Sequence, residues 1–286
     1  MPLAAAALGE TARVPSPPVD DLIASTRPLT ARSVLASALL GAREPRLPVA
    51  HLVAVASLFG ISPGAARTCL WRMVSAGELT TDSATYALAG RLLDRRRRVD
   101  EVARTGHTDA RPWDGTWDLA VVSLDRRGQA DRSDLRKAAG TLHLAEIREG
   151  VWTRPANLDP ERLPDARAVL DRQCVWFRDA RPDLTADAVQ SLFLLDTWAE
   201  DARRLIATLD DSGGAVPPDD PDVPTRLSHQ FDLSVAAVHH LELDPLLPAA
   251  LLPPDWPADE LRVAYRHFDD GFQQTMARAL RTTATA

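Results

Sequence analysis

The sequence of 286 residues predicts an α+β protein of several domains, and three observations carry this prediction. Near the N-terminus, apolar residues recur at helical spacing in three successive segments, and two short strand-like segments follow them. Further along, the order of predicted elements is strand, helix, strand, strand, helix, strand. The last third has a mostly helical pattern. We therefore predict four parts, 1–29, 30–108, 109–182 and 183–286.

The composition is that of a globular protein, with 45% apolar and 26% charged residues. No apolar run reaches the ~20 residues that cross a bilayer. The N-terminus also lacks the basic stretch and hydrophobic segment of a secretory signal. Cys69 and Cys174 are too few for a disulfide scaffold and fit a reducing compartment. We expect a soluble, cytoplasmic protein with no membrane partner.

The charge is unevenly distributed along the chain. The net charge of −7 argues against nucleic acid as a partner, but residues 30–110 hold 11 Arg against seven Asp and Glu, a local charge of +4. The residues after 110 carry −10. A basic N-terminal third joined to an acidic remainder fits DNA binding at one end.

The N-terminal part begins with a segment, 1–29, that is rich in Ala and Pro and is predicted to be a disordered tail. Helices are predicted over 30–41, 49–59 and 63–76. Ser62 is the expected N-cap of the third helix, because a proline occupies the first helical position after it.

A short hairpin is predicted after these helices, with 78–81 and 84–88 as its strands. Three helices with a tight glycine-containing turn between the last two, followed by a hairpin, indicate a winged helix-turn-helix domain. A basic helix over 91–104 contains four consecutive arginines, of which we expect some to flank DNA phosphates. The polar connector 105–112 ends this domain.

The third helix separates into two faces at 100° per residue. The apolar face is predicted to pack inward and consists of Ala66, Cys69, Leu70, Met73 and Val74. The other face carries Arg, Ser and Thr, which suit a recognition helix because Arg bonds guanine edges in pairs and hydroxyls bond phosphate or base. A solvated helix face, with its arginines paired to local acids, is the alternative. The candidate DNA-binding residues are Arg32, Ser62, Gly64, Arg67, Thr68, Trp71, Arg72, Ser75, Thr80, Thr81 and Ser83.

The middle part is predicted to adopt a ferredoxin-like fold, since its elements follow the order β-α-β-β-α-β. The strands and helices are expected over 119–124, 133–142, 145–148, 150–155, 162–172 and 174–177. The C-terminal part is predicted to be helical over 186–209, 226–241 and 259–281. An acidic loop at 210–224 and a proline-rich turn at 244–257 separate these helices.

Sequence patterns of common enzymes are absent. The chain has no phosphate-binding glycine loop, no GxSxG and no HExxH. The cysteines lie far apart and His239-His240 lack further ligands at metal spacing, so we expect no metal and no cofactor. Asp118 and Asp125 flank the first strand of the middle part, where carboxylates can hold a hydrolytic metal. A metal-dependent nuclease or hydrolase is therefore the alternative from another functional class.

Three stretches together resemble the PaaX-type repressors of phenylacetic acid catabolism. Residues 60–79, which contain Gly60-Ile61-Ser62 and Gly77-Glu78-Leu79, are similar to the DNA-reading segment of that family. Trp113-Asp114-Gly115-Thr116-Trp117 is similar to the strand entry of its middle domain. The stretch from Asp244-Pro245 to Trp256-Pro257 is similar to its C-terminal signature and is the most specific of the three. The resemblance covers 30–280 in the family's order.

The resemblance implies a winged helix, a ferredoxin-like domain related to small CRISPR-associated nucleases, and a helical C-terminal domain. It also implies a dimeric repressor that an acyl-CoA, such as phenylacetyl-CoA, releases from its operator. By position, Arg67 and Arg72 match the two arginines of the family's recognition segment. Trp71 departs from the small polar residue that is more usual there. No matched motif identifies an effector pocket.

The leading hypothesis is a homodimeric, ligand-responsive transcriptional repressor that is not an enzyme and that controls an aromatic or carboxylic acid catabolic operon. Its partners would be a double-stranded DNA operator and an aryl- or acyl-CoA. A third reading is an interaction protein whose Arg-rich helix binds an acidic partner instead of DNA.

Overall fold

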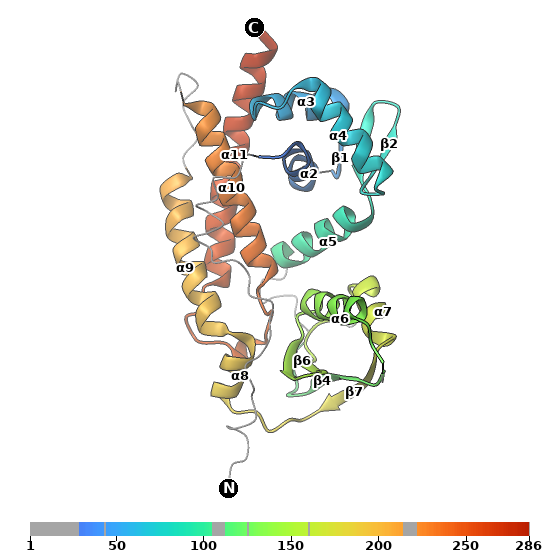
Figure 1. The fold of residues 1–286 in the computed structure, drawn as a ribbon. Coiled ribbons are helices and arrows are strands. Elements are labelled where there is room, and N and C mark those ends of the chain that lie inside the picture. The colour runs from blue at the N-terminus through green and yellow to red at the C-terminus, as the bar shows by residue number, and fades with distance from the viewer. Residues whose placement is uncertain are drawn as a thin grey trace. The chain divides into compact units, whose positions relative to one another are not determined.

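The computed structural model describes most of the chain, and Figure 1 labels its elements. The described residues are 29–42, 44–104, 112–124, 126–159, 161–213 and 222–285, without the side chains of 98–104, 224 and 282–285. The predicted tail at 1–28, most of the connector at 105–111, and Asp125 lie outside them. None of the described helices is both long and apolar enough to span a membrane.

The contacts divide the chain into two compact units. The central unit contains 104–202 and 243–258. Among the described residues, the terminal unit contains those from 29 to 103 together with 203–242 and those from 259 onward. The chain is therefore of the mixed α and β class that the sequence predicts, with ten α-helices and two antiparallel sheets among the described residues.

The terminal unit begins with helices and a small sheet. In chain order these are α2 (Ala31–Gly41), β1 (Arg46–Pro48), α3 (Val49–Leu58), α4 (Pro63–Ser75), β2 (Leu79–Asp82), β3 (Thr85–Leu88) and α5 (Gly90–Arg104). The predicted helix bounds agree to within a few residues because capping signals fix them. Thr30 forms a capping box with Ser33 at the start of α2, and the Ser62 side chain accepts from the Ala65 N–H at the start of α4.

Strand β1 was not predicted. It pairs antiparallel with β3, so the sheet has the order β1-β3-β2. Leu47 lies opposite Tyr86 in this pairing, and both pack against the core of the three helices. That core includes Leu35, Leu39, Leu52, Ala56, Ala66, Leu70, Met73, Leu79, Leu88 and Leu92. The sheet therefore closes one side of the same core that holds α2, α3 and α4 together.

The C-terminal helices differ from the prediction at one position. The sequence predicts a single helix over 186–209, but the chain forms α8 (Ala186–Phe193) and α9 (Leu195–Ser212). Leu194 breaks the helix because its backbone is left-handed, with φ 54°. The helices α10 (Val223–Glu242) and α11 (Ala258–Thr285) match the other two predictions.

The central unit contains a four-stranded sheet. Its elements are β4 (Trp117–Val122), α6 (Gln129–Thr141), β5 (Ala145–Arg148), β6 (Val151–Pro155), α7 (Pro164–Asp171) and β7 (Cys174–Ala180). They follow the predicted order of strands and helices, and the sheet order is β5-β6-β4-β7 with every pair antiparallel. Strand alternation gives the sheet two apolar faces. Ala120 and Trp152 pack with α6 and α7, whereas Leu119 and Ile147 pack with α8.

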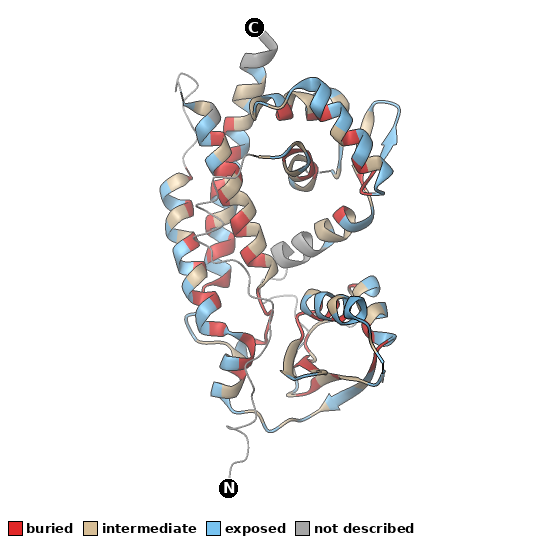
Figure 2. Ribbon diagram, viewed as in Figure 1, coloured by how far each residue is buried: buried red, intermediate tan, exposed pale blue. Residues whose placement is uncertain are grey.

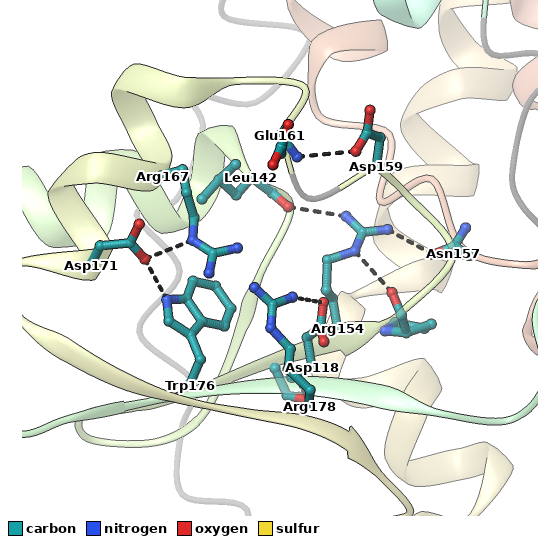
Figure 3. A network of polar contacts seen from close by, with 12 residues as sticks. Asp118, Leu142, Arg154, Asn157, Asp159, Glu161, Arg167, Asp171, Trp176 and Arg178 are labelled. Atoms are coloured by element: carbon teal, nitrogen blue, oxygen red, sulfur yellow. Dashed lines mark hydrogen bonds and ion pairs between the residues drawn. The ribbon is translucent and has the colours of Figure 1, made fainter.

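A buried arginine joins this sheet to the proline-rich turn of the C-terminal signature. Arg154 on β6 donates to the Leu142 carbonyl oxygen (3.0 Å) and to the Asn157 side chain (2.9 Å) (Figure 3). It also donates to the Leu246 carbonyl oxygen, at 3.2 Å. Asn157 also donates to the Leu246 carbonyl, at 2.9 Å. The signature segment therefore has a structural role, because a charged side chain is satisfied by the carbonyl groups that the turn presents.

Candidate nucleic-acid interface

Helix α4 has one buried and one exposed face, as its sequence predicts. Ala66, Leu70 and Met73 are buried in the core, and Cys69 and Val74 pack against it. Figure 2 shows buried and exposed segments following one another along α4. The positions on the other side are all exposed: Gly64, Arg67, Thr68, Trp71, Arg72 and Ser75. This division follows from the 3.6-residue period, because the apolar positions share one side of the helix.

The exposed face of α4 is cationic and carries one large aromatic ring. Arg67 and Arg72 make no ion pair or hydrogen bond with any described residue. Trp71 is 67% exposed, although an exposed tryptophan leaves much apolar surface in water. The Ser75 hydroxyl donates to the Trp71 carbonyl at 3.1 Å. The face therefore offers two available guanidiniums beside an aromatic surface.

The hairpin places the remaining predicted hydroxyls at the surface. Thr80, Thr81 and Ser83 are exposed. The Thr81 hydroxyl donates to the Thr85 carbonyl at 3.1 Å, and Ser83 occupies the turn with φ 51°. The exposed carboxylate of Asp82 adjoins this turn, so the turn itself has no excess of positive charge.

Arg32 is held in an ion pair that the sequence did not reveal. Its Nε and Nη2 donate to the two carboxylate oxygens of Glu78 at 3.0 and 2.7 Å, and Arg91 donates to the same carboxylate at 2.9 Å. Hydrogen bonds from Arg32, and then from Arg91, hold the pKa of the Glu78 carboxyl below its ordinary value. Glu78 follows α4 directly, so the cluster connects α2, the end of α4 and α5.

The arginine run of α5 is also engaged with the protein. Arg96 donates to the carbonyl oxygens at the end of α2, Arg95 lies 3.6 Å from the Glu242 carboxylate, and Arg97 pairs with Asp94 at 3.3 Å. These contacts lie within the terminal unit. Arg95, Arg96 and Arg97 therefore have structural partners, and the side chain of Arg98 lies outside the described residues.

Of the two carboxylates of the enzymatic alternative, Asp118 is paired and Asp125 lies outside the described residues. Asp118 accepts from Arg178 at 2.7 Å, and its side chain is mostly buried. Arg178 and Arg167 both stack over the Trp176 ring, and Asp171 accepts from Arg167 and from the Trp176 indole, each at 2.7 Å (Figure 3). Within the described ranges no group of three or more His, Cys, Asp and Glu side chains could hold a metal ion.

Two family models match the sequence. The model described as "PaaX-like protein" matches 30–92, and the model described as "PaaX protein central Cas2-like domain" matches 110–186. The chain belongs to the PaaX family. Among solved structures it is similar to "Uncharacterized protein Rv0674 from Mycobacterium tuberculosis", with 35% identity and a TM-score of 0.63, over 87% of this chain and 98% of that one. No curated protein matches the sequence.

Membership in the PaaX family supports a regulatory role rather than an enzymatic one. The two matches cover the segments that contain the exposed α4 face and the four-stranded sheet. The nuclease alternative is not favoured, since Asp118 is occupied by Arg178 and family membership points to transcription.

Proposed function

We propose that the chain is a DNA-binding transcriptional regulator whose residues 30–108 form a winged helix-turn-helix domain. The order α2, β1, α3, α4, β2, β3 supports this assignment, because α3 and α4 are joined by a tight turn and β2 and β3 extend as a hairpin behind α4. Residues 109–182 form a ferredoxin-like domain in this proposal, and 183–286 form a helical domain. The all-antiparallel order β5-β6-β4-β7 supports the second assignment.

The exposed face of α4 carries the proposal. Helix α4 would enter the major groove, where Arg67 and Arg72 can each bond a guanine edge in two places and Trp71 can contact a thymine methyl group. The main support for this placement is that both guanidiniums are exposed and make no ion pair with a described residue. Acids three or four positions away can pair with arginines on a solvated helix face, and α4 contains no acid that could do so.

The remaining candidates would contact the DNA backbone. Ser62 at the helix N-terminus and the hairpin hydroxyls Thr80, Thr81 and Ser83 are exposed donors of the kind that bond phosphate oxygens. Arg32 keeps half of its side chain exposed while it holds Glu78, so its outer guanidinium edge is accessible to a phosphate. Such phosphate contacts set the register and orientation of the protein on the duplex and do not themselves read the base sequence.

We further propose a homodimer that acts as a repressor and leaves its operator when an acyl-CoA of the phenylacetyl type binds. Dimeric binding would place two half-sites about one helical turn apart. An effector lowers operator affinity only if it prefers another arrangement of the protein, and a coupling free energy of ~1–3 kcal/mol is typical. Both steps rest on the family resemblance.

The test measures binding of the full chain to DNA from upstream of its own gene by fluorescence anisotropy. Replacing Arg67 with Ala should weaken specific binding by ~1–3 kcal/mol if Arg67 bonds a base. Arg172→Ala is the matched control, because Arg172 is an exposed arginine at the end of α7 that makes no ion pair with a described residue. Equal affinities of these two variants would contradict the assignment.

A salt titration on specific and random duplexes separates DNA binding from capture of another acidic partner. Specific binding should exceed random binding, and affinity for both duplexes should fall linearly with the logarithm of salt concentration. Binding that does not distinguish the two duplexes at any salt concentration would favour the interaction-protein reading.

A further inference from the structure

A cavity of about 870 Å³ adjoins β5, the edge strand of the central sheet. Its lining comes from α6, from β5 and β6, from the end of α8 and from residues just after α10. All of these residues belong to the central unit. The volume lies in the range of ~300–1,000 Å³ that is usual for small-molecule sites.

One wall of the cavity is cationic. It contains Arg127 and, from α6, Arg132, Arg136 and Lys137. None of these four side chains makes an ion pair with a described residue. The single acid in the lining is Glu146, whose carboxylate accepts from the Gly150 N–H at 3.0 Å. Among the described lining residues the cavity therefore has an excess of positive charge, which Glu146 offsets only in part.

Another part of the lining is apolar and aromatic. Trp152, Leu192 and Phe193 belong to it, together with Leu144 and Pro245. Trp152 is 5% exposed, and its indole N–H has no hydrogen-bond partner among the described residues. A buried donor without an acceptor is unfavourable, and such groups are rare in folded proteins. An acceptor oxygen on a bound molecule would satisfy it.

We propose that this cavity binds a phosphorylated organic molecule with an aromatic or other apolar part. A phosphate ester carries a charge of roughly −1.5 to −2 at neutral pH, which matches several cations better than a single carboxylate does. The phosphate lies against Arg132, Arg136 and Lys137, and its ester oxygen accepts from the Trp152 indole N–H. The apolar part packs against Leu192 and Phe193. Nothing in this proposal depends on DNA binding, so its failure and that of the regulator function are separable.

The experiment titrates the full chain with naphthyl phosphate by calorimetry and compares it with naphthol and with inorganic phosphate. Naphthyl phosphate should bind at one site per chain and at least ~10-fold more tightly than either part, because both walls contribute. Absence of binding at millimolar concentration overturns the proposal. Equal affinity for naphthol also overturns it, since the cationic wall would then have no role.

Two variants locate the site. Gly140 lines the cavity, and a Cβ at this helical position meets no atom within 4 Å. Gly140→Leu should therefore fill the cavity without a clash and abolish ligand binding. Arg136→Ala should weaken binding by about 10-fold, and Arg172→Ala should leave it unchanged. Unchanged affinity in both cavity variants overturns the proposal.

A measurement on the unmodified chain does not depend on how the variants fold. The indole N–H resonances of the tryptophans are resolved by NMR, and the signal that is missing in Trp152→Phe is assigned to Trp152. Naphthyl phosphate should shift this signal downfield as the hydrogen bond forms. Binding without a change in the Trp152 signal places the ligand elsewhere and overturns the proposal.

Discussion

The ion pair between Arg32 and Glu78 makes a sharp prediction, because its partners differ in burial. The Glu78 side chain is 5% exposed, whereas those of Arg32 and Arg91 are 53% and 84% exposed. Arg32→Ala leaves a buried carboxylate with Arg91 as its remaining hydrogen-bond donor among the described contacts. Glu78→Gln instead leaves two arginines that water can solvate. The first change should therefore destabilise the terminal unit more than the second.

The magnitude lies between two limits. Exposed ion pairs contribute ~0.2–1 kcal/mol, and removing one partner of a fully buried pair costs ~3–5 kcal/mol. Because both arginines are more than half exposed, water reaches the carboxylate once Arg32 is removed, and we expect a cost of about 1–2 kcal/mol. In the Glu78→Gln background the same Arg32→Ala change should cost less than ~0.5 kcal/mol, as an ordinary surface substitution does.

Native-state hydrogen exchange of β2 and β3 measures these free energies within the terminal unit. A local measurement is needed because a chain of two units does not have to unfold in a single two-state step. The coupling also depends on pH. The folded pKa of Glu78 is lower than its value of ~4.3 in the unfolded chain, so the stabilisation is complete above that value and is lost as the pH falls through the folded pKa. A coupling free energy below ~0.3 kcal/mol at neutral pH would refute the reasoning, because the pair would then behave as a fully exposed one.

Three further substitutions test other parts of the structure. Trp71→Ala should change the free energy of unfolding by less than ~0.5 kcal/mol, since Trp71 is 67% exposed. The same change should weaken operator binding by ~1 kcal/mol or more, and an affinity equal to that of the unmodified chain in anisotropy would contradict its role. Gly90→Ala should lower the free energy of urea unfolding by ~1–3 kcal/mol, because φ is +48° and the new Cβ would lie 2.6 Å from the Gly77 carbonyl oxygen. Gly64→Ala is the control and should leave that free energy unchanged or raise it, since a Cβ there meets no atom within 4 Å. Arg154→Leu should destabilise the central unit by about 2–4 kcal/mol, since it leaves buried carbonyl groups without a donor; a loss below ~0.5 kcal/mol by tryptophan fluorescence would show that the turn needs no such donor.

Local signals explain which elements could be predicted from the sequence. The bounds of α4 follow from a capping serine, a proline at the first helical position and Gly77 after the end, and these signals lie within the segment itself. Strand β1 has three residues and ends in Pro48, and its partner β3 lies far along the chain, so no local periodicity marks it. The break at Leu194 was missed because an apolar residue in the left-handed region leaves no composition signal.

For the candidate site, too, features set within one segment could be predicted, whereas contacts between distant segments could not. The exposed face of α4 follows from helical periodicity, which one segment contains. The ion pairs of other candidate residues do not follow from any one segment. Arg32 and Glu78 are 46 residues apart in the sequence, and Asp118 and Arg178 are 60 residues apart. Whether an arginine is available to DNA depends on these pairings, which only the folded chain brings together.

Regional charge is therefore an incomplete guide to binding surfaces. Residues 30–110 carry a charge of +4, yet several of their arginines are engaged with Glu78, with Glu242 or with backbone carbonyls. The two arginines on the exposed face of α4 make no such contact with a described residue. The residues after 110 carry −10, yet α6 presents Arg132, Arg136 and Lys137 to one cavity without an acidic partner among the described residues. A phosphate responds to the nearby cations that the fold leaves unpaired, because pairing and salt screen the rest. By that criterion the acidic part of this chain offers a proposed anion site with as many cations unpaired among the described residues as the proposed DNA-binding face in its basic part.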